Sequence, residues 1–164
     1  MFRRRISRRR FLGAAAAAAL GPMILPQGVL AAPGRPGAND RIVIGQIGVG
    51  GMGRYHLGRL RDSIVAICDV DDNQIAEAMK TARPETQTCK DYRRILDRND
   101  IDAVLVTAPD HWHGVMTVQA CQAGKDVYVE KPASVTIEEG RAMVEAARRY
   151  GRVVQVGSQG RSMP

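Results

Sequence analysis

A glycine-rich segment, GVGGMG at residues 48–53, constrains this chain more than any other feature, because it directly follows the apolar run 42–47. A short apolar run followed by glycines at the first, third and sixth positions is typical of a buried strand that turns tightly into a helix. A second apolar run ends at Asp69, 21 residues after Gly48. This pattern is the dinucleotide-binding fingerprint, and it predicts a parallel α/β fold.

Each position of the glycine-rich segment has an expected task in binding a nucleotide. Gly48 permits the turn out of the strand, Gly50 lets a pyrophosphate approach the backbone, and Gly53 lets the helix pack closely on the strand. The helix would begin near Gly51 and Met52, where unpaired N–H groups and the helix dipole attract phosphate oxygens. We therefore interpret all five residues as cofactor-binding.

Asp69 sets the expected choice of cofactor. Its carboxylate would accept hydrogen bonds from both hydroxyls of an adenosine ribose and would repel a 2′-phosphate, which favours NAD over NADP. The alternative is a structural glycine turn followed by an ordinary acidic residue at a strand end. The complete pattern favours the NAD site over that alternative.

The N-terminal residues predict an export signal rather than part of the fold. Six arginines lie in the first ten residues, and an alanine-rich apolar stretch follows at residues 14–20. The run SRRRFL at residues 7–12 resembles a twin-arginine signal, with Gly13 at the position where lysine is common. Pro22 and Pro26 break the apolar region and argue against a stable membrane span.

A cleavage-like site completes this interpretation, because VLA at residues 29–31 has small residues at the appropriate spacing. We expect residues 1–31 to be a twin-arginine signal peptide, residues 32–40 a flexible linker and residues 41–164 a nucleotide-binding domain. The twin-arginine machinery would then export the folded protein, with NAD bound, to the periplasm. The alternative is a basic arm that binds nucleic acid or a membrane, but it leaves the alanines and the cleavage-like site unexplained.

The basic net charge belongs to this leader. The whole chain has 24 Lys and Arg against 17 Asp and Glu, a net charge of +7. Without the six arginines of the leader, 18 basic side chains stand against 17 acidic ones. Nothing in the remaining chain resembles a basic groove with stacking aromatic residues, so we expect no nucleic-acid partner.

Strand and helix patterns alternate along the rest of the chain. Apolar, β-branched runs predict strands near residues 42–47, 64–68, 86–89, 103–107, 126–130 and 152–156. Helices are expected between them, near residues 51–60, 73–82, 91–96, 112–122 and 136–150. This alternation predicts a doubly wound parallel sheet, the Rossmann fold, with strand order 3-2-1-4-5-6.

The cysteines and histidines do not predict a metal site. Cys68, Cys89 and Cys121 match no metal-ligand spacing. Cys68 and Cys121 fall in apolar segments and are expected to be buried thiols, while an oxidising compartment leaves open a disulfide between two of the three. His111 and His113 stand two residues apart at a helix start, so their side chains diverge, and no further ligand accompanies them.

A second pattern follows the fourth predicted strand. It comprises APDHWH at residues 108–113, AGKDVYVEKP at residues 123–132, EEGR at residues 138–141 and GSQGRS at residues 157–162. Together these motifs resemble the Gfo/Idh/MocA family of NAD(P)-dependent oxidoreductases, which act on sugars, inositols and related polyols. The DHWH form is most similar to the exported branch of that family. The resemblance extends over residues 41–162, and Glu-Lys-Pro is its most specific mark.

The resemblance implies roles for particular residues. Pro109 and His113 match the loop that passes under the nicotinamide half of the cofactor. Glu130 and Lys131 match the pair beside the nicotinamide, where the lysine contacts substrate and assists proton movement. Lys131 is therefore the expected catalytic residue. The resemblance also implies a cis peptide bond between Lys131 and Pro132.

The chain also departs from the family pattern. Family members continue into a second α/β domain that usually supplies an Asp/His catalytic set and the dimer interface, and we expect that domain to be absent here. An oligomer is then expected only where such a domain is supplied. Exposure is expected on the surface that the second domain would cover, at Ala108, Trp112, Met116 and the tail at residues 157–164.

The resemblance implies the nucleotide-binding domain of an exported NAD-dependent oxidoreductase that acts on a secondary alcohol of a sugar or polyol. Two alternatives stay open. One is an NAD-dependent glycosidase of the same family, in which the cofactor transiently oxidises a sugar hydroxyl. The other is an NAD-binding fragment with no catalytic activity.

Overall fold

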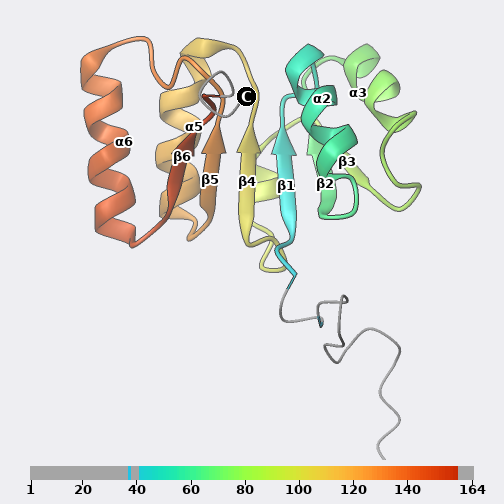
Figure 1. Ribbon diagram of the computed structural model, residues 1–164, viewed down its shortest axis with the longest axis horizontal. Helices are drawn as coiled ribbons and strands as arrows, with labels where there is room; N and C mark the ends of the chain where they lie inside the picture. Colours follow the sequence, from blue (N-terminus) through green and yellow to red (C-terminus); the bar gives the residue numbers. More distant parts are fainter. Residues whose placement is uncertain (1–36, 38–40, 159–164) are drawn as a thin grey trace, which may run out of the picture. The chain divides into compact units, whose positions relative to one another are not determined.

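The computed structural model describes residues 37 and 41–158 (Figure 1). The predicted signal peptide at residues 1–31 lies outside the described residues, as does the predicted linker at residues 32–40 apart from Gly37. A compact unit extends from Ile42 onward. Within the described part of the chain, no helix is both long enough and apolar enough to cross a membrane.

Six parallel strands form one sheet in the order β3-β2-β1-β4-β5-β6, which confirms the predicted doubly wound arrangement (Figure 1). Ile47 in β1 pairs on one side with Cys68 of β2 and on the other with Val106 of β4. The strands are β1 (Ile44–Ile47), β2 (Ile64–Cys68), β3 (Gln87–Cys89), β4 (Ala103–Val106), β5 (Asp126–Val129) and β6 (Val154–Val156).

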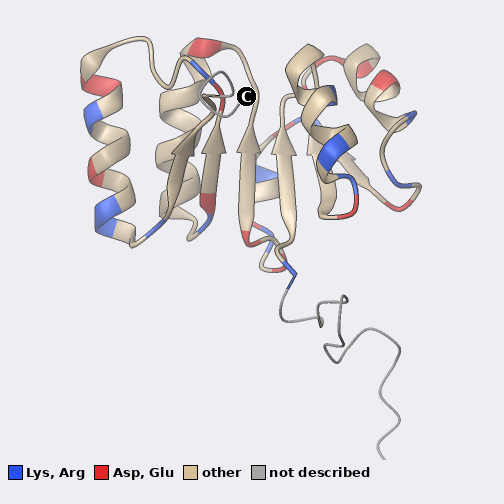
Figure 2. Ribbon diagram, viewed as in Figure 1, with Lys and Arg blue, Asp and Glu red and all other residues tan. Residues whose placement is uncertain are grey.

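One helix follows each of the first five strands. These helices are α2 (Gly51–Leu60), α3 (Asp72–Met79), α4 (Arg93–Leu96), α5 (Asp110–Gln122) and α6 (Ile137–Tyr150). Figure 2 shows that charged residues gather on these helices and on the loops, whereas Asp126 is the one charged residue within the six strands.

Capping residues explain where the helices begin. The Asp71 side chain accepts a hydrogen bond from the Asn73 N–H at 2.8 Å, so α3 begins at Asp72 and not at the predicted residue 73. Pro109 is the N-cap of α5, which therefore starts two residues earlier than predicted. Thr136 and Glu139 form the expected reciprocal capping box at the start of α6.

Alternating strand side chains supply two apolar cores. On one side of the sheet, Ile64 and Ile67 pack with Leu57 of α2 and Ala78 of α3. On the other side, Val104 and its neighbours pack under the remaining helices. This second core includes Ile95 and Leu96 of α4, Met116, Ala120 and Cys121 of α5, and Met143 and Ala146 of α6.

The face of β4–β6 on the α2 side carries an apolar groove of about 490 Å³. Leu105 and Tyr128 form part of its floor, and Leu60 of α2 lies along one edge. At its margins, Ile42 and Val153 are 62% and 69% exposed. No described helix packs over this groove, so the two halves of the sheet differ in how completely they are covered.

Candidate functional site

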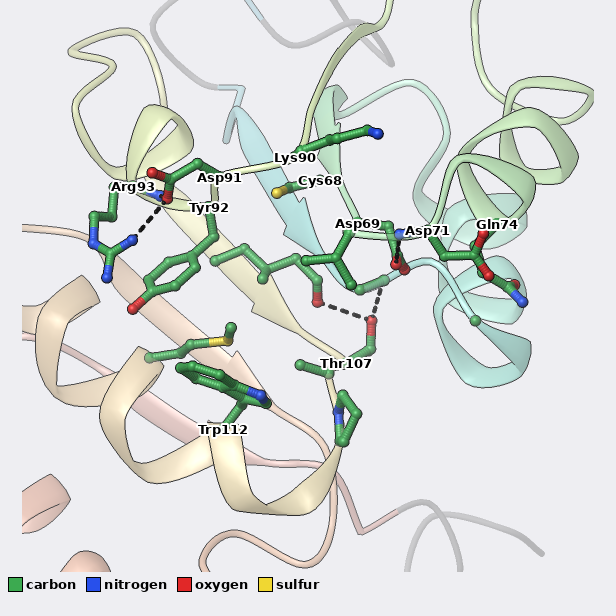
Figure 3. Close-up of a pocket in the computed structure, with 17 residues that line it drawn as sticks. Cys68, Asp69, Asp71, Gln74, Lys90, Asp91, Tyr92, Arg93, Thr107 and Trp112 are labelled. Carbon is green, nitrogen blue, oxygen red and sulfur yellow. Dashed lines mark hydrogen bonds and ion pairs between the residues drawn. The ribbon is translucent and has the colours of Figure 1, made fainter.

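A pocket of about 800 Å³ opens at the carboxyl ends of the strands (Figure 3). Ligands of open α/β sheets bind at such ends, where the strand order reverses, and here the reversal lies between β1 and β4. The walls come from the glycine-rich segment, the chain after β2 and β3, and the start of α5. Four predicted site residues line this pocket: Gly48, Gly50, Asp69 and Pro109.

The glycines of the 48–53 segment fall into two groups. Gly48 has φ +88°, and a Cβ there would lie 2.6 Å from the Thr107 backbone. A Cβ on Gly53 would lie 2.5 Å from the Gly48 carbonyl oxygen, so both positions require glycine for the loop to close. A Cβ on Gly50 or Gly51 would meet no atom within 4 Å. The space at Gly50 is thus open to a ligand that approaches the backbone.

This open space lies at the N-terminus of α2. Gly50 is the N-cap of the helix, and its first turn, which includes Gly51 and Met52, contains no acidic side chain. The first N–H groups of a helix lack intrahelical partners and carry partial positive charge. A phosphate group suits this position both by space and by charge.

Two polar side chains that sequence reasoning missed hold the glycine-rich segment in place. Gln46 is fully buried in β1, and its Nε2 donates to the carbonyl oxygens of Gly53 at 2.7 Å and Gly48 at 3.1 Å. The Thr107 hydroxyl, just after β4, also donates to the Gly48 carbonyl oxygen. In the sequence, the one indication of this role for Gln46 is that a glutamine interrupts the apolar run 42–47.

Asp69 directly follows β2 and faces the glycine-rich segment. Its Oδ2 accepts a hydrogen bond from the Val49 N–H at 2.9 Å, and its Oδ1 accepts one from the Asp71 N–H at 3.0 Å. A carboxylate offers about four lone-pair positions, so this arrangement leaves capacity for ribose hydroxyls. The two backbone bonds fix the carboxylate at the edge of the pocket (Figure 3).

The opposite wall of the pocket is apolar and aromatic (Figure 3). The Tyr92 and Trp112 rings meet edge-on with centroids 6.5 Å apart, and the Tyr92 hydroxyl donates to Gln119 at 2.7 Å. Trp112 is 41% exposed, as expected, and Ala108 is half-buried. The expectation of exposure is wrong for Met116, which packs into the core beneath α5, and for Gly157, which is buried. Residues 159–164 of the predicted exposed tail lie outside the described residues. A planar ring system suits such a wall.

The loop after β5 carries the predicted catalytic lysine. The peptide bond between Lys131 and Pro132 is cis, which confirms that prediction. Lys131 is exposed, whereas Glu130 is buried with its Oε1 2.7 Å from Nε2 of His56. Oε2 of Glu130 accepts a hydrogen bond from the Lys131 N–H at 3.1 Å. Glu130 therefore connects the Lys131 loop to α2, the helix whose N-terminus faces the pocket.

His56 was not among the predicted site residues. It lies three residues after Gly53 and is buried on α2, next to the Tyr128 ring. Burial, followed by the nearby Glu130 charge, raises the pKa of Tyr128. In the sequence, the only indication of this role is that the polar His56 falls on the buried side of the helix predicted at residues 51–60. Its partner Glu130 is 74 residues away, so the contact could not be predicted from the helix alone.

His113 lies inside the protein rather than on the pocket wall. Its side chain is almost fully buried, with Nδ1 2.6 Å from the Pro132 carbonyl oxygen and Nε2 2.7 Å from the Ala108 carbonyl oxygen. These contacts tie the loop after β4 to the loop after β5. His113 thus holds two site loops together, and Pro109 in the first of them lines the pocket.

The glycine-rich turn, the acidic residue after β2 and the open helix N-terminus define a Rossmann nucleotide-binding domain. A family model described as an oxidoreductase family with an NAD-binding Rossmann fold matches residues 42–158. The chain therefore belongs to the Gfo/Idh/MocA family of oxidoreductases, and its cofactor is NAD.

Curated relatives resemble the chain over this same domain. The chain is 32% identical over 119 residues to an inositol 2-dehydrogenase of Salmonella typhimurium, covering 69% of this chain and 35% of the relative. It is 34% identical over 122 residues to a glycosyl hydrolase family 109 protein of Shewanella putrefaciens, covering 67% of this chain and 27% of the relative. The chain spans about a third of the length of the curated relatives it matches.

Solved structures share the fold. A myo-inositol 2-dehydrogenase from Lactobacillus plantarum superimposes with a TM-score of 0.66 at 28% identity, covering 75% of this chain and 38% of that one. The WlbA dehydrogenase from Chromobacterium violaceum, solved with NADH and UDP-GlcNAcA, gives a TM-score of 0.68 at 27% identity, covering 74% and 36%.

Proposed function

We propose that this chain is the cofactor-binding part of an enzyme that oxidises a secondary alcohol of a sugar or polyol with NAD. The observation that supports this proposal most directly is the buried contact between Glu130 and His56, because it ties the loop of the exposed Lys131 to α2, the helix whose N-terminus faces the pocket. The similarity to inositol dehydrogenases supports a polyol or sugar as the substrate class.

In the proposed reaction, NAD supplies the acceptor for the hydride that leaves the alcohol carbon. The Lys131 ammonium would stabilise the negative charge that develops on the substrate oxygen as the hydride departs. The α2 N-terminus and Asp69 would hold the phosphates and the ribose. The group that accepts the hydroxyl proton would come from the second domain that the family resemblance implies.

The test joins residues 41–158 to the second domain of the Salmonella typhimurium inositol 2-dehydrogenase and measures NADH formation with a panel of sugars and inositols. We expect turnover by the joined protein. The Lys131→Met variant should lower kcat by about 10²–10⁴-fold and leave NAD affinity unchanged. Lys80→Met, at an exposed lysine on α3's C-terminal side, is the matched control. Full activity in the Lys131→Met variant would contradict the proposal.

An NAD-dependent glycosidase is the second candidate, because of the 34% identity to the glycosyl hydrolase family 109 protein. Here the hydride would return to the substrate after the glycosidic bond has broken. A product assay separates the two reactions. Net NADH supports the dehydrogenase, whereas free sugar without net NADH supports the glycosidase.

The 164-residue chain alone is expected to bind NAD without appreciable turnover, because Lys131 would act without a general base. A general base contributes about 10²–10⁴-fold in rate. NADH formation of order one per second by this chain would show that it completes the site by itself. Such turnover would also exclude the alternative of a non-catalytic NAD-binding module.

We also propose that residues 1–31 direct export to the periplasm through the twin-arginine route. The support is the SRRRFL run with its alanine-rich region and cleavage-like VLA. Replacing Arg8 and Arg9 with lysine should leave the uncut precursor in the cytoplasm, measured by fractionation of expressing cells. Normal export of this variant would contradict the twin-arginine assignment.

A further inference from the structure

Two cysteines face each other at the edge of the NAD site. Cys68 of β2 and Cys89 of β3 are register partners on adjacent parallel strands, and both are free thiols. Neighbouring strands lie about 4.8 Å apart, within the Cα separation of about 4.4–6.8 Å that a disulfide spans. Cys89 packs against the apolar core that contains Cys68, so both side chains lie on the same side of the sheet.

The backbone of this pair carries residues that bind the cofactor. The Cys68 carbonyl oxygen accepts a hydrogen bond from the Gly48 N–H at 2.8 Å. The Cys89 carbonyl oxygen accepts one from the Asp69 N–H at 3.2 Å. The Cys68 side chain itself lines the pocket, next to Asp69 (Figure 3). A change in how β2 and β3 meet would therefore move both Gly48 and Asp69.

We propose that Cys68 and Cys89 form a reversible disulfide and that its formation competes with NAD binding. The strand spacing of about 4.8 Å suits the Cα separation of a disulfide, but the bond also requires Cβ atoms about 3.5–4.5 Å apart, so the two side chains must turn toward each other. Forming the bond would rotate the backbone at Cys68 and shift the carboxylate of the adjoining Asp69. By thermodynamic linkage, bound NAD disfavours the disulfide by the same factor by which the disulfide weakens NAD binding.

The oxidant would be a small-molecule disulfide such as oxidised glutathione. Cys89 is half-buried and Cys68 is 3% exposed, so Cys89 reacts first. Its thiolate bonds to one glutathione sulfur and displaces the other as a thiolate, which takes up the proton that Cys89 released. The Cys68 thiolate then attacks the Cys89 sulfur and displaces the second glutathione, which takes up the Cys68 proton. Two protein thiols and one disulfide thus become one protein disulfide and two glutathione thiols.

The exchange should be slow near neutral pH. Burial raises the pKa of Cys68, with the Cys89 sulfur as the next largest cause, and burial also raises the pKa of Cys89. The reactive thiolate is therefore a minor species at pH 7, and its fraction increases as the pH rises. Uncatalysed exchange of this kind takes minutes to hours.

The experiment equilibrates the full chain in glutathione buffers of increasing oxidised fraction, with and without NAD. We expect the loss of two hydrogen masses, mapped by peptide mass spectrometry to a Cys68–Cys89 link. NAD binding, followed by the fluorescence of Trp112, the one tryptophan of the sequence, should weaken by about tenfold on oxidation. Saturating NAD should shift the oxidation midpoint toward more oxidising buffers.

Cys121→Ser is the matched control, because it removes the third cysteine, on α5, and should preserve the linked product. Cys89→Ser should abolish the link, and Cys68→Ser provides the same test should one of the two variants fold poorly. A glutathione adduct alone, or no oxidation, would overturn the proposed pair. A Cys68–Cys89 link with unchanged NAD affinity would overturn the competition. The mass measurement without NAD does not depend on nucleotide binding, so the two failures are distinguishable.

Discussion

Strands β1–β3 carry helices on both faces, whereas the α2-side face of β4–β6 holds an open apolar groove. The ligand-facing loops of the two regions are also held differently. In the first region, Gln46 fixes the glycine-rich segment from only two and seven residues away. In the second, Glu130 is fixed by His56, 74 residues earlier in the chain.

This difference indicates two separable properties. NAD binding depends on local backbone geometry at the end of β1, where glycines and short-range hydrogen bonds determine the shape. The position of Lys131 depends on the buried contact that joins Glu130, just after β5, to His56 of α2. Substitutions in the first region should therefore change NAD affinity, and substitutions in the second should change stability and the Lys131 loop with little effect on NAD.

The largest expected effect is that of Gly50→Val on NAD binding. The added side chain would occupy the open space at the α2 N-terminus without meeting a protein atom at Cβ, so the fold should be retained. We expect NAD affinity to fall by at least about 100-fold, or roughly 2.7 kcal/mol, measured by calorimetry. Gly58→Val, at an exposed position of the same helix, is the control. Unchanged affinity in Gly50→Val would mean that the phosphate site lies elsewhere.

The second expected effect is on stability. Glu130→Ala would leave His56 and the Lys131 N–H without their carboxylate, at a cost of about 1–3 kcal/mol in the free energy of unfolding. Chemical denaturation measures this change, with Glu138→Ala on the exposed start of α6 as the control. NAD affinity should change by less than about threefold. A large loss of NAD affinity with intact folding would show that the two regions are not separable.

A smaller effect is expected at Asp69. The Asp69→Ala variant should bind NAD about tenfold more weakly, because the acceptor for the ribose hydroxyls is lost. The difference between its affinities for NAD and NADP should also become smaller, because the repulsion of a 2′-phosphate is removed. The Asp69→Asn variant keeps an acceptor for the Val49 N–H, so it should lose less NAD affinity than Asp69→Ala. It should still reduce the difference between the affinities for NAD and NADP. Equal affinities for NAD and NADP in the unmodified protein would contradict this role.

The smallest expected effect is a loss of stability at alkaline pH. Burial raises the pKa of Cys68 and Cys121 above the ordinary thiol value of 9.0. Below pH 9 both states keep these protons, whereas above it the unfolded chain loses them first, so the free energy of unfolding declines as pH rises. Denaturant titrations from pH 7 to 10 should show this decline. In the Cys121→Ala variant, the free energy of unfolding should decline less steeply with pH. An unchanged dependence on pH in that variant would contradict a contribution from the buried Cys121 thiol.

Local patterns were sufficient to predict the sheet. The Thr136 capping box follows from two residues three positions apart, whereas the strand order follows from the alternation of strand and helix patterns along the chain. The structure confirms both. The starts of α3 and α5 were displaced because Asp71 and Pro109 act as caps outside the apolar pattern. Such capping residues change the position at which a helix begins, but not the presence of the helix.

The supports of the site could not be predicted in the same way. Glu130 and His56 meet only after β5 and α2 are placed against each other, and no local pattern encodes that distance. Met116 was expected on the surface that a second domain would cover, but the helix turns it toward the core. Pairing across elements depends on the assembled sheet, which single-sequence patterns do not contain.

The buried ring of His113 also has a kinetic consequence. It contacts the Ala108 and Pro132 carbonyl oxygens at once, so the loops after β4 and β5 cannot separate without opening the 2.6 Å contact between His113 Nδ1 and the Pro132 carbonyl oxygen. Loop excursions on the microsecond to millisecond timescale should then be correlated, with both segments sharing one exchange rate in relaxation-dispersion measurements. The loops after β4 and β5 would then move as one rigid unit, because the His113 imidazole connects them.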